Sequence, residues 1–335
     1  MRAGQSLASR KRLEMPIEPA AVSVKAPVED LADWLEIRAF RDRDGNGSYI
    51  DLLNALRMSG TVDALSEDDD EAEPEARTWE DPYEGAAESA LSEIADRFKA
   101  CGAEDGSYPF ETGANFVALT SNTHSSVYVF LLLLSCYGQH PSVRGAAGEK
   151  LFEEVCAKAA EAYLGGRHAN VKSLVFGFPR RVLPRGFRDA VTALCGALQE
   201  GRGPKARPNL RDQKDAKLDV VAWRGFDDGR AGKLIAFGQC ATGSNWTEKL
   251  TELQADKWCF LWMEEMPAVN PIRVFFVPHR VSEREWISAN AYGGILFDRC
   301  RIARHSQLLG RPLQRQLEAW SQHVLTKIGG WRINE

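Results

Sequence analysis

The sequence lacks paired cysteines. None of its seven cysteines belongs to a CxxC pair, and its His and Cys residues do not have the spacing of a zinc site. The number of cysteines is odd, and most of them lie in apolar runs. We therefore expect reduced, buried thiols in a cytoplasmic protein, and we do not expect a secreted disulfide scaffold.

Long apolar segments are also missing. The longest apolar run, Val127–Tyr137, is far shorter than the roughly 20 residues that a transmembrane helix needs, so it predicts a buried helix. Residues 1–26 contain Pro16 and Pro19 but no apolar stretch, which is typical of a disordered tail rather than a secretory signal. We expect no association with a membrane.

The sequence has no excess of positive charge. Its formal net charge is -5, whereas many nucleic-acid-binding domains are basic overall. The charge is unevenly distributed, however, because residues 64–74 are acidic while 167–217 and 299–315 are rich in Arg and Lys. Local charge decides how a polyanion is bound, so the second half of the chain remains a candidate for nucleic-acid binding.

The length of 335 residues predicts two domains. We assign 27–145 to a mainly helical N-terminal module of unknown role, with an acidic linker near 64–80, and 146–335 to a second domain. In the first module, the spacing of apolar residues predicts helices and a pair of strands. The helices are expected at 28–60 (around a glycine-rich turn), 84–100 and 124–137, and the strands within 109–120.

Residues 42–47 resemble the start of an EF-hand calcium loop. Acidic or amide side chains stand at loop positions 1, 3 and 5, and Gly47 is at position 6. The bidentate Glu required at position 12 is replaced by Leu53, however, and this loss should weaken calcium binding severely. The segment therefore predicts a turn between two helices rather than a calcium site.

The second domain alternates helical and strand patterns, which is typical of an α/β fold. Two short apolar runs, 218–223 and 233–239, flank a turn and predict a hairpin. The other predicted elements are helices at 149–163, 186–200, 245–254 and 312–327 and strands at 171–178 and 272–278.

Polar side chains stand at both ends of the predicted hairpin. Asp219 comes at the start of its first apolar run, and Gln239 comes at the end of its second. A polar side chain among buried Val, Ala and Phe needs a partner, since leaving it unpaired costs free energy. A Mg²⁺ ion, which prefers oxygen ligands, is one such partner. A strand-start hydrogen bond for Asp219 and a satisfied core amide for Gln239 are the structural alternatives.

The strings LDVVAWRGF and GKLIAFGQCATGSNW, which contain these two residues, resemble the PD-(D/E)xK (restriction-endonuclease-like) nucleases. The resemblance covers roughly 146–300 and implies a mixed sheet flanked by helices, with Mg²⁺ or Mn²⁺ as cofactor. It implies that Asp219 is the strand Asp and that Gln239 occupies the Glu/Gln position. Glu153, on the preceding helix, would complete the metal ligands and Glu149 is the second choice for this position.

The lysine of the family pattern is absent from its usual place. Two residues after Gln239 the sequence has Ala241. The resemblance implies that Lys249, on the following helix, has taken over this role, although a surface lysine is the structural alternative. A cluster of arginines flanks the predicted core and would contact phosphates, or would simply form a solvated face. These arginines are Arg180, Arg181, Arg185 and Arg188.

The resemblance implies Mg²⁺-dependent hydrolysis of DNA phosphodiester bonds by an effector or restriction-type nuclease of antiphage defence. It implies a homodimer or a companion defence-system protein as partner, because cutting two strands needs two sites. No small-molecule cofactor is evident. Two alternatives remain open, namely an inactive nuclease scaffold that binds nucleic acid or assembles a complex, and a nuclease directed at RNA.

Overall fold

A computed structural model describes most of the chain. The predicted tail at 1–26 and the acidic linker near 64–80 lie largely outside the described residues, and so does part of the predicted turn in the hairpin. The described residues are 17, 21–66, 81–102, 107–121, 126–144, 147–166, 170–206, 213–226 and 228–329.

The N-terminal region is helical with one small sheet. The short strands pair antiparallel in the order β1-β3-β2, and helices α1 and α3 contact each other. The strand pair expected within 109–120 is confirmed. The elements are α1 (Val28–Arg41), β1 (Asn46–Ser48), α2 (Tyr49–Ser66), α3 (Pro82–Ala100), β2 (Phe110–Thr112), β3 (Phe116–Leu119) and α4 (Val127–Tyr137).

The segment that resembles a calcium loop forms a turn and a short strand. One carboxylate oxygen of Asp42 accepts hydrogen bonds from the backbone N–H groups of Asp44 (2.9 Å) and Asn46 (3.3 Å). The next residues, β1, pair with β3. Leu53, at the position of the missing bidentate ligand, is buried in α2. The turn between two helices is therefore held by Asp42 itself.

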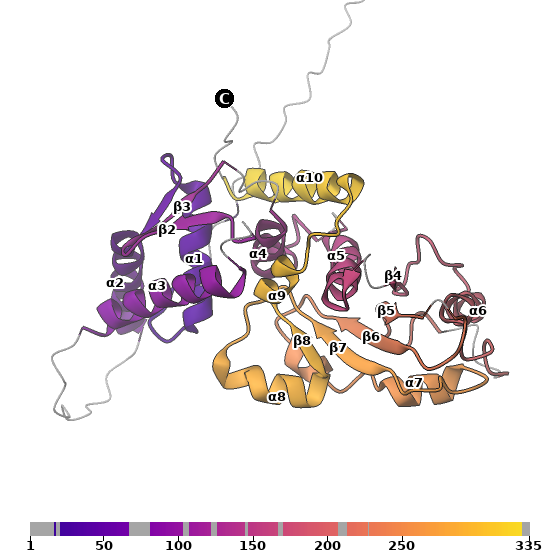
Figure 1. Ribbon diagram of the computed structural model, residues 1–335. Coiled ribbons are helices and arrows are strands. Elements are labelled where there is room, and N and C mark those ends of the chain that lie inside the picture. The colour runs from indigo at the N-terminus through magenta and orange to yellow at the C-terminus, as the bar shows by residue number, and fades with distance from the viewer. Residues whose placement is uncertain are drawn as a thin grey trace, which may run out of the picture.

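The remainder of the chain forms a mixed five-stranded sheet flanked by helices (Figure 1). Strands β4, β5 and β6 are antiparallel, whereas β7 and β8 run parallel to β6. The strands are β4 (Val171–Val175), β5 (Val220–Arg224), β6 (Leu234–Cys240), β7 (Ile272–Phe276) and β8 (Ile295–Phe297). The helices are α5 (Gly148–Tyr163), α6 (Phe187–Leu198), α7 (Ala255–Trp262), α8 (Glu283–Gly293), α9 (Arg299–Arg304) and α10 (Arg311–Lys327).

Alternating side chains direct the two faces of this sheet into different apolar clusters. In β5, Val220 and Ala222 join the cluster that contains α5, whereas Val221 and Trp223 join the cluster of α6 and α7. In Figure 1, α5 and α9 lie on one side of the sheet and α7 and α8 on the other. The expected α/β architecture with a helical N-terminal region is thus confirmed at this level.

One apolar core is shared by the N-terminal region and the sheet. The same cluster contains Leu35 of α1, Phe130 of α4, Phe276 of β7 and Trp320 of α10. The rings of Phe130 and Trp320 meet edge to face with centroids 5.1 Å apart. The core therefore continues across the expected domain boundary at 145/146.

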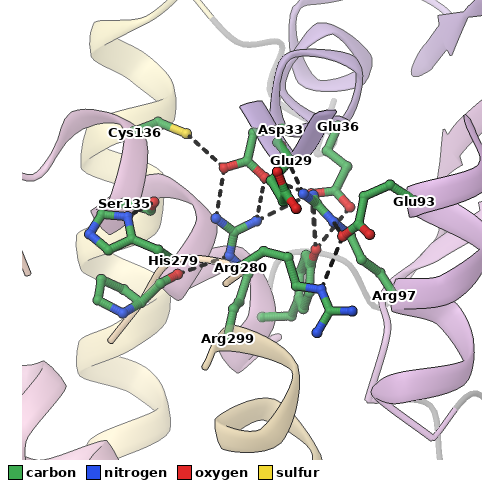
Figure 2. Close-up of polar contacts among 12 residues, drawn as sticks. Glu29, Asp33, Glu36, Glu93, Arg97, Ser135, Cys136, His279, Arg280 and Arg299 are labelled. Atoms are coloured by element: carbon green, nitrogen blue, oxygen red, sulfur yellow. Dashed lines mark hydrogen bonds and ion pairs between the residues drawn. The ribbon is translucent and has the colours of Figure 1, made fainter. Parts of the chain in front are cut away.

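A network of buried charges joins the same two parts of the chain (Figure 2). Arg299 of α9 donates to both carboxylate oxygens of Asp33 on α1, at 2.6 and 2.7 Å. Arg97 of α3 donates to Asp33 at 2.7 Å and to Glu36 at 3.0 Å. Glu36 also accepts hydrogen bonds from two tyrosine hydroxyls, and both arginines are fully buried. A buried charge of this kind is tolerated only when it is paired and hydrogen-bonded.

The helix predicted at 245–254 is wrong. Only Trp246–Lys249 forms a short 3-10 helix, and α7 begins later, at Ala255. Trp246 and Leu250 pack in a cluster with α8, whereas Leu253 packs in the cluster of α6 and α7. The chain crosses from one cluster to the other here, and a continuous helix would keep these side chains on one face.

Three further elements, α8, β8 and α9, were not assigned from the sequence pattern. They extend the sheet by one strand and supply Arg299 to the buried network. Among the described residues, no helix is both long enough and apolar enough to cross a membrane.

His279 belongs to the same junction between the N-terminal region and the sheet. Its Nδ1 lies 2.7 Å from the hydroxyl oxygen of Ser135 on α4. Burial, together with the nearby charge of Arg299, lowers the pKa of His279 to about 4. The folded protein therefore keeps this imidazole neutral at pH values where the unfolded chain protonates it.

We predict that replacing Arg299 destabilises the fold strongly. Arg299→Met leaves Asp33 buried beside a single remaining guanidinium, and loss of one partner of a buried pair costs about 3–5 kcal/mol. Denaturant unfolding measures the change. Arg284→Met, which removes an exposed arginine of α8, is the control and should change stability by less than about 0.5 kcal/mol. Equal, small losses in the two variants would contradict the assigned role.

We predict a pH-dependent contribution from His279. Its folded pKa lies below its unfolded value, so its contribution is complete above about pH 6.5 and is lost as the pH falls toward 4. Between pH 7 and pH 4, the wild type should lose on the order of 3 kcal/mol more stability than His279→Gln. Denaturant unfolding at several pH values tests this, and parallel stability curves for the two proteins would refute it.

Candidate functional site: an acidic pair at the edge of the sheet

Two acidic side chains meet where helix α5 crosses the start of strand β5. Glu153 lies on the buried face of α5, between the apolar residues Phe152 and Val155, and is 8% exposed. Asp219 immediately precedes β5, and one of its carboxylate oxygens accepts a hydrogen bond of 2.8 Å from the backbone N–H of Cys240. The amphipathic pattern of α5 and the hairpin of β5 and β6 thus bring together two acids far apart in the sequence.

Gly177 shows how closely the two carboxyl groups approach. A Cβ atom placed on Gly177 would lie 2.6 Å from Oε2 of Glu153 and 3.1 Å from Oδ1 of Asp219. The two oxygens, one from each acid, therefore face the same point beside the backbone of residue 177. A residue with a side chain at this position would displace one of them.

Neighbouring positive charge does not offset the burial of either acid. Burial raises the pKa of Glu153 to about 7. Burial also raises the pKa of Asp219 well above its ordinary value, and the neighbouring charge of Glu153 adds to this shift. Two buried carboxyl groups with raised pKa values beside each other form a pattern that is enriched at functional sites.

Lys150 supplies the amine nearest to this pair. Its Nζ donates to both carboxylate oxygens of Glu153, at 2.6 and 2.9 Å, and its charge lowers the pKa of Glu153 against the effect of burial. The sequence reasoning did not single out Lys150. The sequence feature that could have identified Lys150 is its i, i+3 spacing from Glu153 on one helix. Many pairs with this spacing lie on solvated surfaces, however, so it does not indicate a site by itself.

Gln239 has a different set of neighbours. Its side-chain N–H donates to Glu252 at 2.7 Å, and the other carboxylate oxygen of Glu252 accepts from Lys217 at 3.1 Å. Oε1 of Gln239 is buried without a hydrogen-bond partner among the described atoms. Such an orphaned oxygen is a free acceptor, and a cation or an ordered water satisfies it at little cost.

Lys249 lies in the 3-10 helix after β6 and is half-buried. Over the described ranges, its side chain makes no hydrogen bond or ion pair. The structure thus does not connect Lys249 to Asp219, Gln239 or Glu153. Its expected role in activating water stays a prediction.

The predicted phosphate-binding arginines differ in exposure. Arg180 is buried, donates to the backbone carbonyls of Arg185 and Lys214, and lies over the ring of Phe176. These contacts hold the loop that follows β4. Arg181 is exposed and pairs with Glu154 of α5 at 2.7 Å. Arg185 and Arg188 are exposed, so both are accessible to a phosphate.

The donor atoms fit a hard divalent cation. Asp219 and Glu153 offer carboxylate oxygens at one point beside Gly177, whereas the unpartnered amide oxygen of Gln239 belongs to a side chain that contacts Glu252 instead. No cluster of three His, Cys, Asp or Glu side chains with metal-binding geometry occurs within the described segments. A cation here would therefore depend on water and substrate oxygens for its remaining ligands, as Mg²⁺ sites commonly do.

Comparisons with protein-family models, curated proteins and solved structures found no match for this chain. The interpretation of the acidic pair therefore depends on the geometry described above.

We predict that Lys150→Met raises the pKa of Glu153 further above its ordinary value, because it removes the ammonium group that pairs with that carboxylate and lowers its pKa. Carbon-13 NMR titration of labelled glutamate carboxyl groups measures the shift. Lys158→Met is the matched control, since Lys158 pairs with Glu161 at the same spacing on the same helix. An unchanged or lowered Glu153 pKa in Lys150→Met would contradict this account.

Proposed function

We propose that this protein is a metal-dependent nuclease of the PD-(D/E)xK type that hydrolyses DNA with Mg²⁺ or Mn²⁺. The observation that carries the proposal is the meeting of Glu153 and Asp219 beside Gly177. A helix acid and a strand-start acid are the two carboxylates that the sequence resemblance assigns to the metal. Burial raises both pKa values, and a bound cation would favour the charged forms of the two carboxyl groups.

The order of elements around the pair supports a restriction-endonuclease-like core. Helix α5 carries Glu153 and is followed by β4, helix α6 and then β5 and β6, and the three strands pair antiparallel. Helix α7 and the parallel strand β7 come next. Asp219 stands at the start of β5 and Gln239 near the end of β6, as the resemblance requires.

In this proposal, the side chains divide the work between binding and orientation. Glu153 and Asp219 would hold the cation, whereas Gln239 occupies the Glu/Gln position of the resemblance near the end of β6, and no described contact links it to the pair. When bound, the cation lowers the pKa of a coordinated water and offsets charge on the phosphate. Lys150 holds the Glu153 carboxylate and would orient a water or phosphate oxygen next to it.

We assign the lysine role to Lys150 rather than to Lys249. Lys150 contacts a proposed ligand directly, whereas the side chain of Lys249 has no polar contact in the part of the chain that the structure describes. The side chain at the usual position, Ala241, is buried and apolar. A lysine on the helix that precedes the strands would then replace the lysine that the family pattern places on the third strand.

The loop that begins directly after Gly177 supplies the proposed DNA contacts. Arg180 braces this loop from inside, and Arg185 and Arg188 face solvent near its end. Phosphate contacts of this kind position a duplex without reading its sequence. We propose double-stranded DNA as substrate, a homodimer or companion protein as partner, and a setting in antiphage defence or restriction.

A plasmid-cleavage assay with the full chain tests the proposal. Wild-type protein should nick or cut supercoiled plasmid with Mg²⁺ or Mn²⁺, and EDTA should stop the reaction. Asp219→Asn, Glu153→Gln and Lys150→Met should each lower the rate by about a hundredfold or more, the range for loss of a catalytic group. Lys249→Met is the matched control and should keep the rate within about twofold, as expected of a half-exposed lysine without contacts.

Gly177→Ala separates a damaged site from a damaged fold. The added Cβ meets the far end of the Glu153 side chain, which can swing away at little cost to the backbone. Cleavage should fall while the melting temperature stays near that of the wild type.

Undiminished cutting by Asp219→Asn would overturn the proposal. A folded wild type that binds DNA but cuts neither DNA nor RNA would instead favour the inactive scaffold, and cutting of RNA alone would reassign the substrate.

A further inference from the structure

A second site lies at the other end of helix α5. A cavity of about 580 Å³ opens between the end of α5, strand β8 and helices α8 and α9. Its volume falls in the range of small-molecule sites, about 300–1,000 Å³. Three aromatic side chains and several charged ones line it, including Tyr163, Trp286, Phe297, Arg301, Arg304 and Glu283.

The aromatic wall presents one accessible ring. Tyr163, the last residue of α5, is 47% exposed although its ring meets Phe297 edge to face at 5.2 Å. It also meets the ring of His305 at 5.5 Å. Two neighbouring rings thus contact Tyr163 while nearly half of the residue remains exposed. A flat apolar group could stack on it.

The lining also contains two arginines that have no described ion pair. Arg301 lies over the ring of Trp286 at 4.4 Å and donates one hydrogen bond to the carbonyl of Leu296, but it has no ion pair among the described residues. Arg304 is exposed, and its guanidinium likewise has no hydrogen bond or ion pair in the described ranges. Arg280, by contrast, is bound by Glu93 and Asp298.

The pKa of His305 reflects the positive charge of the two neighbouring arginines. Burial lowers its pKa, and the charges of Arg304 and Arg301 lower it further. The imidazole is therefore neutral at pH 7 and leaves the two arginines as the uncompensated cations. Glu283 is the one carboxylate of the lining that has no described ion pair. The cavity thus combines a partly exposed tyrosine, two guanidiniums without a described ion pair and one carboxylate without a described ion pair.

We propose that this cavity binds a nucleoside monophosphate. The base stacks on Tyr163, the phosphate is held by Arg301 and Arg304, and the Glu283 carboxylate accepts hydrogen bonds from the sugar hydroxyls. Guanidinium groups suit phosphate because they donate several hydrogen bonds in one plane. An acidic peptide would use the arginines but would leave Tyr163 and the neighbouring Glu283 without a counterpart, so the combined lining favours a nucleotide.

The cavity is distinct from the acidic pair. Tyr163 stands ten residues after Glu153 on the same straight element, which corresponds to about 15 Å along an α-helix. No residue named for the nuclease site lines the cavity. The inference therefore does not depend on the proposed function, and each can fail without the other.

Isothermal titration calorimetry of the full chain with AMP, GMP, CMP and UMP tests the proposal. At least one nucleotide should bind with a dissociation constant below about 1 mM, and adenosine and inorganic phosphate should each bind at least tenfold more weakly, since each offers only part of the contacts. Arg304→Glu should weaken binding by about tenfold or more. Arg315→Glu, the same change at an exposed arginine of α10, should leave binding unchanged.

Two further variants make the result specific. Tyr163→Leu keeps an apolar side chain but removes the ring, and it should weaken the nucleotide while leaving the weak binding of phosphate unaltered. Asp219→Asn should bind the nucleotide as the wild type does, which separates this cavity from the acidic pair. Bound phosphate should also raise the pKa of His305, as observed by proton NMR. Absence of binding to all four nucleotides, or equal binding by Arg304→Glu, would overturn the proposal.

Discussion

The buried carboxylate of Asp33 imposes the main constraint on this structure. Burial alone would raise its pKa, but Arg299 and Arg97 outweigh that effect and hold its pKa below the ordinary value. The two guanidiniums come from α9 and α3, and both donate to the same carboxylate oxygen of Asp33 on α1. Leaving a buried charge unpaired costs several kcal/mol. The packing of the N-terminal helices and that of the end of the sheet domain therefore depend on each other.

The Asp33 network and the acidic pair differ in how far neighbouring cations offset the burial of their carboxyl groups. Both contain buried carboxyl groups and at least one cation. At Asp33 the cations prevail, and the carboxylate is fixed in its charged form. At Glu153 and Asp219 burial prevails over the single ammonium of Lys150, so both pKa values rise. A bound cation would favour the charged forms of these two buried carboxyl groups. This is the physical argument for the metal-dependent chemistry proposed here.

The sequence predicted local elements well and long-range contacts poorly. Strong apolar periodicity placed α5 and the two strands of the hairpin within about two residues, and Asp219 and Gln239 stand where that pattern put them. Lys150 was overlooked because its spacing from Glu153 is equally typical of a surface pair. The helix at 245–254 failed because its apolar residues belong to two clusters. The partnership of Asp33 with Arg299 spans almost the whole chain, and no local pattern encodes it.

The position of the acidic pair depends on the N-terminal region through packing as well as charge. Helix α5 begins at Gly148, where a Cβ atom would lie 2.8 Å from the ring of Trp320 on α10. Trp320 in turn packs against Phe130 of α4. The first turn of α5, which carries Lys150 just before Glu153, therefore packs against α10, and α10 in turn packs against α4. Because a tightly packed core transmits displacement, the placement of the first turn of α5 depends on α10 and, through α10, on α4.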